Sequence, residues 1–352
     1  MRVALVAASP RIVGGQSVQA VALVDGLRHS GYDVTFLPID PPFPPGLEWV
    51  REWPYVRTVL NQAIYLPGLG RLRRADVVHV FSASYWSFLL TVVPALLAAK
   101  ALGKRAVLHY HSGEAEDHLA NWGLRVHPWL RLADAIVVPS DYLRDVFARF
   151  GYRAQVVPNI VDTTRFAGPE RATLRPRLLS ARNLAPYYRV DNTVDAFALV
   201  KRRFADATLT IAGDGSQRSR LERQVATLGL RGVEFVGRVE PEAMPALYRN
   251  ADIFVNSSVV DNQPVSVLEA FAAGLPVVST ATGDIAALVR DGETGLLVRP
   301  GDPEGMAAAV STLLERQDLA RCLTRRARHV VEEFSWPAVR DRWAAVYSGA
   351  AA

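Results

Sequence analysis

Apolar and polar positions along the chain follow two alternating patterns. Short runs of apolar and often β-branched residues, such as residues 3–7, are separated by longer segments in which apolar residues recur every three or four positions. The first of these segments carries its apolar residues at the spacing i, i+3, i+4 and i+7, namely Ala20, Leu23, Val24 and Leu27. Alternating strand and helix periods of this kind predict βαβ units with parallel strands.

The predicted strands form two series. In the first half they cover residues 3–7, 34–39, 77–81, 106–110, 135–138 and 155–157, and in the second half residues 177–181, 208–212, 233–235, 253–256, 277–279 and 295–298. Between the series lies a polar segment, residues 162–173, that contains glycine and proline, as domain boundaries often do. The sequence therefore predicts two doubly wound α/β domains, residues 1–168 and 169–333, followed by a last helix in residues 334–352.

The composition agrees with two buried cores. The 352 residues are 50% apolar and 21% charged, as expected of an ordinary globular protein. The single cysteine, Cys322, excludes a disulfide framework and a cysteine-based metal cluster. The first strand begins at the start of the sequence, so no signal peptide is expected. The apolar stretch of residues 88–99 is too short to cross a bilayer and is interpreted as a core helix, and the expected location is the cytoplasm.

The cations are almost all arginines, since only 3 of the 40 Lys and Arg residues are lysines. Guanidinium groups can bind phosphate or carboxylate in a bidentate manner, although a GC-rich genome would produce the same bias. The net charge of +5 is modest and no nucleic-acid-binding module is visible. Nucleic acid is therefore not an expected partner.

The most informative segment is residues 256–276, NSSVVDNQPVSVLEAFAAGLP. A strand ends here, a polar loop follows, Pro264 stands where a helix would begin, and Gly274 would end it. The free amide groups at such a helix start favour a phosphate. Asp261 and Glu269 would hold sugar and ribose hydroxyls, or they are solvated carboxylates that the helix dipole favours.

With these motifs in place, the chain resembles the retaining GT-B glycosyltransferases of family 4, which use nucleotide sugars. The resemblance rests on the spacing of Asp261 and Glu269 and on shorter motifs in the order typical of the family, found in residues 157–166, 212–215, 235–237, 251–254, 274–278 and 291–298. It covers nearly the whole chain. It implies two Rossmann-like domains that face each other across a cleft, a C-terminal helix that returns to the N-terminal domain, and no metal or other cofactor.

The resemblance also implies which residues meet the donor. Glu269 would bond the ribose, and Asp261 would hold hydroxyls of the donor sugar. The sugar and diphosphate would meet the residues of the loop and helix start, namely Asn262, Gln263, Pro264, Val265 and Ser266, and the base would lie beside Gly237 and Arg238. Gly213, in a strand-to-helix turn, is a further candidate for donor binding, although a tight turn explains it equally well.

Two departures from the family pattern affect this site. The family usually has glutamate where this chain has Asp261, and the shorter side chain could displace the donor sugar by about an ångström. The family also places an arginine and then a lysine against the diphosphate. Arg182 supplies the arginine, but a tyrosine occupies the region of the lysine, so Arg189 is the candidate substitute.

The N-terminal half contributes three further candidates. Gly14 and Gly15 follow the first strand and would let a ligand approach the backbone, or they form a plain turn. His111 ends a later strand, and the resemblance makes it the histidine near the donor sugar. The spacing of His109, His111 and His118 fits no common zinc pattern, so no metal site is predicted.

The implied activity is retaining transfer of a sugar from a nucleotide-diphosphate sugar to a hydroxyl acceptor, which would be a glycan, a lipid-linked molecule or a small molecule. The catalytic candidates are His111, Arg182, Asp261 and Glu269. Such enzymes serve bacterial envelope or glycan biosynthesis. A catalytically weak or inactive donor-binding homologue and a nucleotide-sugar 2-epimerase are the alternatives.

Residues 43–74 combine several aromatic residues with several arginines, including Trp49, Trp53, Arg51 and Arg57. This composition would suit a peripheral contact with anionic lipid at the inner face of a membrane. A solvated basic face with partly buried aromatic residues is the other interpretation. The acceptor is expected on the N-terminal domain, near the Gly14 loop, the proline-rich residues 41–45 and the Tyr85–Trp86 turn.

Overall fold

The computed structural model describes residues 1–11, 14–82 and 84–350. The chain forms two compact units, and each is described by itself. The first unit consists of Met1–Pro158 and Val339–Ala352, and the second of Asn159–Ala338. The division into domains at residues 168 and 333 stays a prediction.

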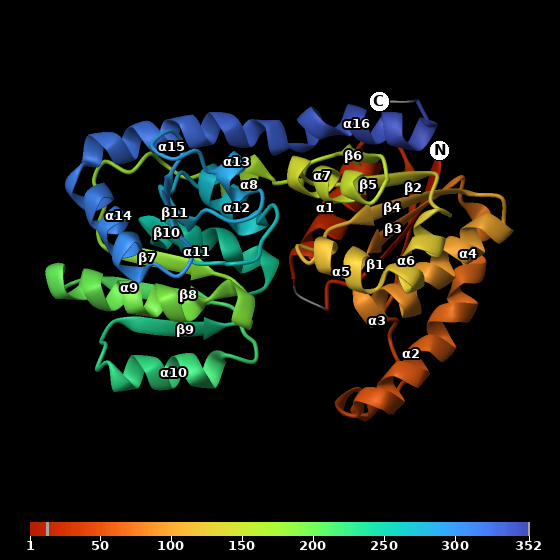
Figure 1. The fold of residues 1–352 in the computed structure, drawn as a ribbon, viewed down its shortest axis with the longest axis horizontal. Helices are drawn as coiled ribbons and strands as arrows, with labels where there is room; N and C mark the ends of the chain where they lie inside the picture. The colour runs from red at the N-terminus through yellow and green to blue at the C-terminus, as the bar shows by residue number, and fades with distance from the viewer. Residues whose placement is uncertain (12–13, 83, 351–352) are drawn as a thin grey trace. The chain divides into compact units, whose positions relative to one another are not determined.

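The first unit contains a parallel six-stranded sheet in the order β2-β1-β3-β4-β5-β6 (Figure 1). Its strands are β1 (Arg2–Ala7), β2 (Asp33–Pro38), β3 (Val77–Ser82), β4 (Arg105–Tyr110), β5 (Ala135–Val138) and β6 (Ala154–Val156). Every residue of β3 and β5 is buried, because helices cover both faces of a parallel sheet. The predicted strands of this half are therefore confirmed, with bounds that differ by at most one residue.

The helices of the first unit are α1 (Gly15–His29), α2 (Pro54–Gly68), α3 (Tyr85–Ser87), α4 (Val93–Ala101), α5 (Ala115–Asn121), α6 (Gly123–Leu130), α7 (Asp141–Arg149) and the C-terminal helix α16 (Trp336–Ser348), whose greater part belongs to this unit. The core helix expected over residues 88–99 is helical throughout and largely buried, but its first turn is π-helical. A π-helical turn, Phe88–Val92, separates α3 from α4. Pro94 has no amide hydrogen to donate to the carbonyl four residues earlier, and a widened turn accommodates that loss.

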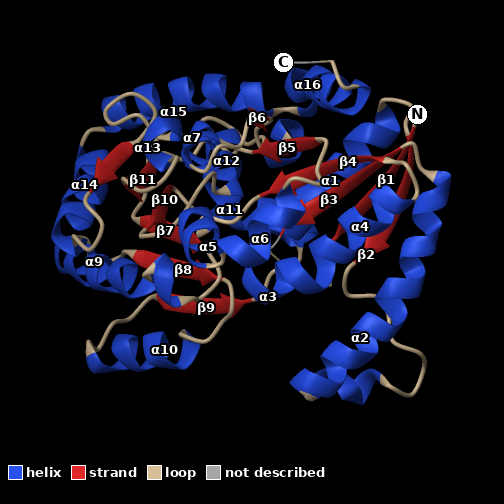
Figure 2. Cartoon of the chain, turned by 45° about the vertical axis from the view of Figure 1, so that its right-hand side comes forward, coloured by secondary structure: helices blue, strands red, loops and turns tan. Residues whose placement is uncertain are grey.

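The second unit contains another parallel six-stranded sheet, in the order β12-β11-β10-β7-β8-β9 (Figure 2). Its strands are β7 (Arg177–Ala181), β8 (Thr208–Ala212), β9 (Val233–Gly237), β10 (Ile253–Asn256), β11 (Val277–Thr280) and β12 (Leu296–Val298). Its helices are α8 (Thr163–Phe166), α9 (Val190–Arg203), α10 (Arg218–Thr227), α11 (Met244–Asn250), α12 (Val265–Ala272), α13 (Ile285–Leu288), α14 (Pro303–Glu315) and α15 (Gln317–Val331). The second series of predicted strands is confirmed as well.

Helix α16 packs on the first sheet. Trp343 and Tyr347 are 1% and 2% exposed, and the Tyr347 hydroxyl lies 2.8 Å from Nδ1 of His79 on β3. Arg105 Nε donates to the carbonyl of Val346 over 3.1 Å. The expected return of the last helix to the N-terminal domain is therefore confirmed. In the part of the chain that the structure describes, no helix is long and apolar enough to span a membrane.

Candidate functional site

The strand order of the second sheet reverses between β7 and β10. Strands β8 and β9 lie on one side of β7, whereas β10, β11 and β12 lie on the other. In open α/β sheets, ligands bind outside the carboxyl ends of the strands at such a reversal. The loop that leaves β7 begins with Arg182, and the loop that leaves β10 contains Asp261.

Arg182 and Asp261 form an ion pair at this reversal point. Their side chains are 10% and 11% exposed. Arg182 Nη1 also donates to the Ser266 hydroxyl over 3.3 Å, and its guanidinium carbon lies 4.1 Å from the centre of the Tyr188 ring. The structure therefore brings together three of the predicted site residues, which belong to the loops after β7 and β10 and to the start of α12.

The charge of Arg182 is held in place by its surroundings. Burial is the largest single effect and lowers the pKa of the guanidinium, but Asp261, together with smaller contributions from Tyr188, Tyr248 and Tyr187, leaves the net pKa raised. The Nε atom of Arg182 is buried and has no hydrogen-bond partner among the described residues. A fixed cation with an unused donor can accept a further anionic ligand.

Helix α12 begins beside this ion pair. Pro264 precedes the helix, and the first amide that finds a helical acceptor is that of Val267, which donates to the Pro264 carbonyl over 3.0 Å. The amides of Val265 and Ser266 precede that first bond, so they are the orphan donors of a helix start. The positive end of the helix dipole and the unpaired amides of a helix start favour a phosphate group.

Glu269 lies one turn further along α12 and is 8% exposed. The Tyr248 hydroxyl, from α11, lies 2.7 Å from Glu269 Oε2 and donates to it. Burial raises the pKa of Glu269 to about 7, and the Tyr248 hydrogen bond opposes this rise. Sequence analysis missed Tyr248, because nothing in its local pattern distinguishes it from an ordinary apolar contact of an amphipathic helix.

The loop between Asp261 and α12 is anchored from another segment. The backbone amide of Asn159 donates to the side-chain Oε1 of Gln263 over 2.7 Å, and the side-chain Nδ2 of Asn159 donates to the backbone carbonyl of Gln263 over 2.8 Å. Asn262 is 5% exposed, and its backbone amide donates to Asp261 Oδ1. Gln263 therefore has a structural partner, whereas the sequence suggested only a ligand contact.

Two glycines allow neighbouring loops to pack closely against the backbone of Arg182 and of Asp261. Gly213 has φ +143°, and a Cβ there would lie 1.9 Å from the Arg182 carbonyl oxygen. Gly283 has φ +52°, and a Cβ there would lie 1.9 Å from the Asp261 carbonyl oxygen. Gly213 thus allows the loop after β8 to pass under Arg182, and Gly283, which sequence analysis missed, allows close packing beneath Asp261.

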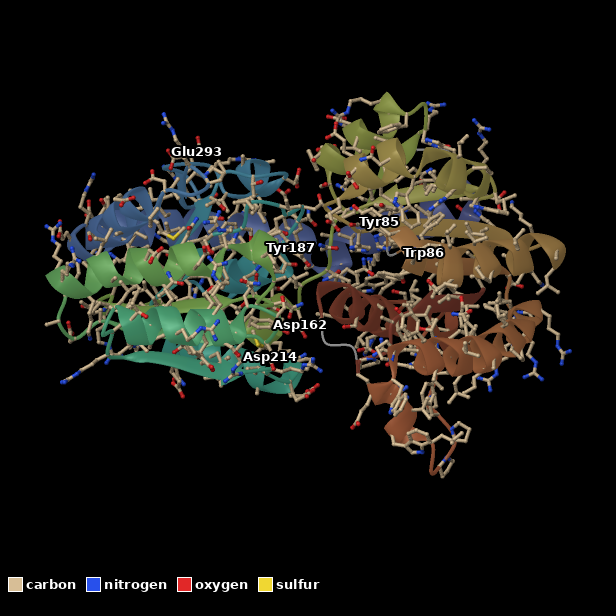
Figure 3. The ribbon with its side chains drawn as sticks, turned by 60° about the horizontal axis from the view of Figure 1, so that its bottom comes forward. Tyr85, Trp86, Asp162, Tyr187, Asp214 and Glu293 are labelled. Carbon is tan, nitrogen blue, oxygen red and sulfur yellow. The ribbon has the colours of Figure 1, made fainter. Side chains whose placement is uncertain are left out.

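Gly237 ends β9, and its carbonyl accepts a hydrogen bond of 2.8 Å from the backbone amide of Gly213. Arg238 is exposed. Figure 3 shows Tyr187 and Asp214, which follow β7 and β8, on the same side of this unit. Gly237 thus ends, and Arg238 follows, the strand next to β8, which precedes Asp214. Their predicted contact with a base stays a prediction.

Arg189 binds partners close to it in sequence. It precedes α9 with φ +44°, and its Nε binds Asp191 over 3.0 Å while its Nη2 donates to Asn192 Oδ1 over 3.0 Å. Its side chain is 41% exposed. The Ser257 hydroxyl donates to the Arg189 carbonyl over 2.7 Å. The structure thus pairs Arg189 with Asp191, whereas Arg182 pairs with Asp261.

His111 follows β4 in the first unit. Its ring stacks on Phe81 at 5.1 Å with an interplanar angle of 13°, and its Nε2 is buried without a hydrogen-bond partner among the described residues. Burial lowers the pKa of His111 to about 3, so the ring is neutral at physiological pH. His109 lies 4.0 Å from His111 between ring centres, and His79 Nε2 lies 3.2 Å from His109 Nδ1. This row of histidines connects His111 to Tyr347 on α16.

The remaining candidates of the first unit lie at the start of α1. Gly14 precedes the helix, and the Ser17 hydroxyl lies 2.9 Å from the Gly14 carbonyl. A Cβ at Gly14 or Gly15 would meet nothing within 4 Å. These glycines are therefore not required by protein packing, which leaves room for a ligand. Across residues 1–11, 14–82 and 84–350, no group of three His, Cys, Asp or Glu side chains is arranged to hold a metal ion.

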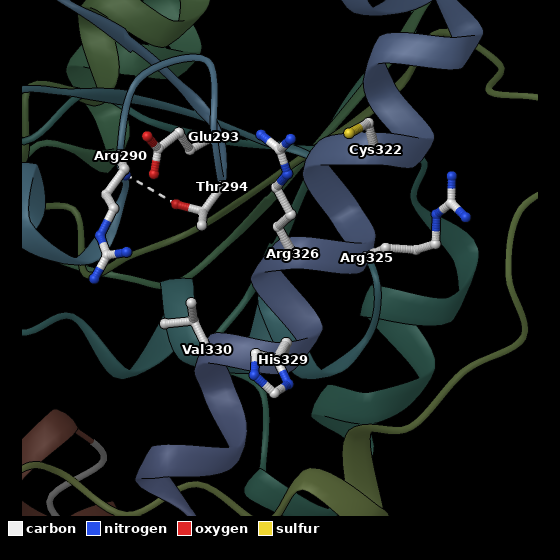
Figure 4. Close-up of a pocket in the computed structure, with 8 residues that line it drawn as sticks. All are labelled: Arg290, Glu293, Thr294, Cys322, Arg325, Arg326, His329 and Val330. Atoms are coloured by element: carbon white, nitrogen blue, oxygen red, sulfur yellow. Dashed lines mark hydrogen bonds between the residues drawn. The ribbon is translucent and has the colours of Figure 1, made fainter.

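A shallow pocket of about 540 Å³ lies elsewhere on the second unit, beside α15. It is lined by residues of the 290–294 turn and of α15, namely Arg290, Glu293, Thr294, Cys322, Arg325, Arg326, His329 and Val330. The side chains of Arg290 and Arg325 point in different directions (Figure 4). The pocket shares no residue with the Arg182 site, and its cations do not converge on one point.

Comparison with known proteins identifies the family of the chain. Residues 13–165 match the family described as Glycosyltransferase Family 4, and residues 175–316 match Glycosyl transferases group 1. A glycogen synthase of Mycobacterium tuberculosis (strain H37Rv) is 31% identical over 299 residues, which are 80% of this chain and 71% of the relative. A GDP-mannose-dependent alpha-(1-6)-phosphatidylinositol monomannoside mannosyltransferase of Mycolicibacterium smegmatis is 31% identical over 239 residues, 62% of this chain and 63% of that protein.

Solved structures share the fold over the whole chain. Anabaena Alr3699/HepE in complex with UDP-glucose superposes with a TM-score of 0.77 at 18% identity, covering 99% of this chain and 100% of that one. Sucrose-phosphate synthase of Thermosynechococcus elongatus has a TM-score of 0.75 at 20% identity, covering 99% and 98%. Fold and sequence together define a glycosyltransferase that uses a nucleotide-sugar donor. The chain belongs to family 4, group 1, of these enzymes.

Proposed function

We propose that this glycosyltransferase acts with retention of configuration and holds the donor diphosphate between Arg182 and the start of α12. The observation that carries the proposal is the buried Arg182, which is paired with Asp261 and still has an unused Nε donor. Next to it are the free amides of Val265 and Ser266. These groups supply positive charge where negative charge grows as the sugar leaves the diphosphate.

The other site residues have roles that follow from their chemistry. Glu269, fixed by Tyr248, accepts hydrogen bonds from the ribose hydroxyls. Asp261 orients the donor sugar and keeps Arg182 in position. His111 is neutral, and its buried Nε2 is free to bind a hydroxyl of the sugar or of the acceptor. Arg189 is a secondary contact, because reaching the diphosphate would require it to leave Asp191.

In the proposed reaction, the bond between the anomeric carbon and the diphosphate oxygen breaks as the bond to the acceptor oxygen forms on the same face. The acceptor proton passes to the departing diphosphate, so the protein need not supply a nucleophile. The protein contributes positioning and electrostatic stabilisation of the leaving group. The acceptor is a hydroxyl of a glycan, a lipid-linked sugar or a small molecule.

The test is nucleotide release from UDP-, GDP- and ADP-sugars, with and without simple glycoside acceptors, followed by NMR of the anomeric configuration. We expect one donor class to be used and the α-configured donor to give an α-linked product. A β-linked product would contradict retention. Donor binding without transfer would favour an inactive homologue, and a product epimerised at carbon 2 would favour an epimerase.

A contact with anionic lipid is a second proposed property, favoured by the surface around α2. Trp49, Trp53, Tyr55 and Val59 are 59%, 59%, 90% and 70% exposed. Arg57 belongs to the same helix, and Arg71, Arg73 and Arg74 follow it closely. An exposed aromatic face beside arginines suits the inner surface of a membrane, next to the cytoplasm. Flotation with phosphatidylglycerol vesicles at low salt tests this proposal, and an unbound protein would refute it.

A further inference from the structure

The turn that follows β3 is held in an unusual backbone conformation. Tyr85 has φ +58°, which a bulky residue rarely adopts. Apart from Tyr85, only Arg189 among the described non-glycine residues has a positive φ. A sparsely populated conformation persists only where the surroundings hold it, and such positions cluster at functional sites.

A buried hydrogen-bond chain holds Tyr85. Its backbone amide donates to Nε2 of His118 over 3.0 Å, so Nδ1 of this neutral ring carries the hydrogen. That nitrogen lies 2.8 Å from the Tyr110 hydroxyl, which in turn lies 3.1 Å from the Ser84 hydroxyl. The Tyr85 hydroxyl donates to Asp117 Oδ2 over 2.7 Å. Both ends of Tyr85 are thus fixed to the segment that follows β4.

The fixed turn presents an indole ring to solvent. Trp86 is 62% exposed, although it packs edge to face against Trp122 at 5.4 Å and 88°. Tyr85 also packs on Trp122, at 5.5 Å. Figure 3 shows Tyr85 and Trp86 next to each other in the first unit. Trp86 is therefore an exposed aromatic surface near the carboxyl ends of β3 and β4, the strand that His111 follows.

The charges around Trp86 differ from those around α2. Asp117 binds Tyr85 directly. Burial, then the Asp117 hydrogen bond and then the charge of Glu114 raise the pKa of Tyr85, so both carboxylates lie near the turn. Glu116, in the first turn of α5, is paired with Arg149 over 3.0 Å and adds no unbalanced charge. A cation, Arg125, also lies nearby, with its guanidinium carbon 5.2 Å from the centre of the Trp122 ring. Carboxylates repel an anionic lipid surface, whereas they accept hydrogen bonds from hydroxyl groups. The aromatic surface with acidic neighbours therefore suits a neutral polyol.

From this combination we infer that the Tyr85–Trp86 turn is a binding site for the acceptor, and that the acceptor ends in a neutral pyranose ring that stacks on the Trp86 indole. The role of the bound saccharide as acceptor rests on the proposed function. Saccharide binding at the turn does not depend on the donor. Acidic sugars and phosphorylated head groups are disfavoured at this turn. The Trp86 ring supplies apolar contact, and Glu114 and Asp117 bind ring hydroxyls.

The test measures saccharide binding to the full chain without donor, by saturation-transfer NMR with methyl α-glucopyranoside, methyl α-mannopyranoside and maltotriose as probes. We expect Trp86→Ala to weaken binding by about tenfold and Trp86→Phe to restore most of it, because an aromatic face is retained. Trp53→Ala is the matched control, since Trp53 is similarly exposed at 59% in the same unit. Its binding should equal that of the unchanged protein.

A second comparison tests the charge argument. Methyl β-glucuronide should bind more weakly than methyl β-glucopyranoside, and Glu114→Gln should narrow this difference by about threefold. UDP, GDP and ADP binding are measured in parallel and should not change in Trp86→Ala. Failure of all nucleotides to bind would count against the proposed function alone.

The site is refuted if none of the probes binds the unchanged protein saturably, or if Trp86→Ala binds as well as the unchanged protein. An equal loss in Trp53→Ala would also refute it. Loss of phosphatidylglycerol-vesicle binding in Trp86→Ala, with saccharide binding unaffected, would assign the turn to a membrane instead.

Discussion

The Tyr248 hydroxyl donates a 2.7 Å hydrogen bond to the buried carboxylate of Glu269, which lies 21 positions later in the chain. This bond stabilises the ionised form of a group that burial otherwise keeps protonated. The two effects leave the pKa of Glu269 at about 7, near physiological pH. A group so placed changes both stability and ligand binding over a narrow pH range.

The first prediction concerns the stability of the second unit. A carboxyl pKa raised from 4.5 to about 7 means that the native state binds more protons than the unfolded state between these values. The unfolding free energy should therefore fall as pH rises from 4.5 to 7, by about 3 kcal/mol from this group. Glu269→Gln should remove this part of the slope in urea unfolding at several pH values. An unchanged slope would contradict the buried position of Glu269.

The same carboxylate should make nucleotide binding pH-dependent. If the ionised Glu269 accepts ribose hydroxyls, nucleotide affinity should decrease as pH falls from 8 to 6, because protonation removes an acceptor. Isothermal titration calorimetry with the preferred nucleoside diphosphate measures this change. Glu269→Gln should bind weakly at every pH, and Glu293→Gln, at an exposed carboxylate of the same unit, should keep the unchanged profile.

A second prediction concerns the ion pair of Arg182 and Asp261. Asp261→Asn leaves a buried guanidinium without its counter-charge and should lower stability by about 3–5 kcal/mol. Transfer should be lost as well, whereas Asp261→Glu, which restores the usual family residue, should keep both. Because the donor diphosphate would supply a new anionic partner, the bound nucleotide should raise the melting temperature of Asp261→Asn more than that of the unchanged protein. A smaller rise would contradict the placement of the diphosphate at Arg182.

The third prediction separates the two candidate arginines. Arg182→Gln should abolish measurable nucleotide binding, since it removes the buried cation of the site. Arg189→Gln should weaken binding by less than about tenfold, because Arg189 is 41% exposed and already bound to Asp191. Fluorescence titration of both variants with the same nucleotide makes the comparison. Equal losses would indicate that Arg189 leaves Asp191 and replaces the missing lysine.

The fourth prediction uses a pair of glycines. Gly283→Ala would place a Cβ 1.9 Å from the Asp261 carbonyl oxygen, so the loop that carries Asp261 must move. Gly292→Ala carries a similar backbone penalty, at φ +70°, but its Cβ would meet nothing within 4 Å. The positive φ alone should lower the unfolding free energy of each variant by about 1 kcal/mol. Only Gly283→Ala should also lose transfer activity. Equal activity of the two variants would mean that the Asp261 loop tolerates displacement.

The fifth prediction concerns the first unit in acid. His79 is buried, and burial lowers its pKa to about 3, so the native state stays neutral while the unfolded state binds a proton below pH 6.5. Stability should therefore fall as pH decreases below 6.5, by about 1.4 kcal/mol per pH unit for each such histidine. His79→Gln should reduce this slope in thermal unfolding. The exposed His329, changed to glutamine, is the control and should leave the slope unaltered.

Much of the fold was predictable because it depends on local patterns. Strand and helix periods located every strand of both sheets, since burial on both faces gives continuous apolar runs. The position of Pro264 and Gly274 placed α12 correctly, whereas phosphate binding at its start stays a prediction. The π-helical first turn of the helix over residues 88–99 was missed, because Pro94 is compatible with a helix start as well as with a widened turn.

The side-chain partners of the site could not be predicted in the same way. The family resemblance indicated that Asp261, Glu269 and Arg182 belong to one site, but not that Arg182 pairs with Asp261, 79 positions away. It also could not distinguish Arg182 from Arg189, which is only seven positions later in an arginine-rich chain. The left-handed conformation of Arg189 and its bond to Asp191 arise from the local geometry at the start of α9.

By itself, the sequence determined the alternation of elements, the two-sheet architecture and the family, because periodicity and motif order are local properties of the chain. The tertiary structure alone decided which groups share a low-dielectric environment: Arg182 with Asp261, Tyr248 with Glu269, and Tyr85 with His118. Burial and partner distance control charge state and hydrogen bonding, and both depend on strands that are distant in sequence lying side by side.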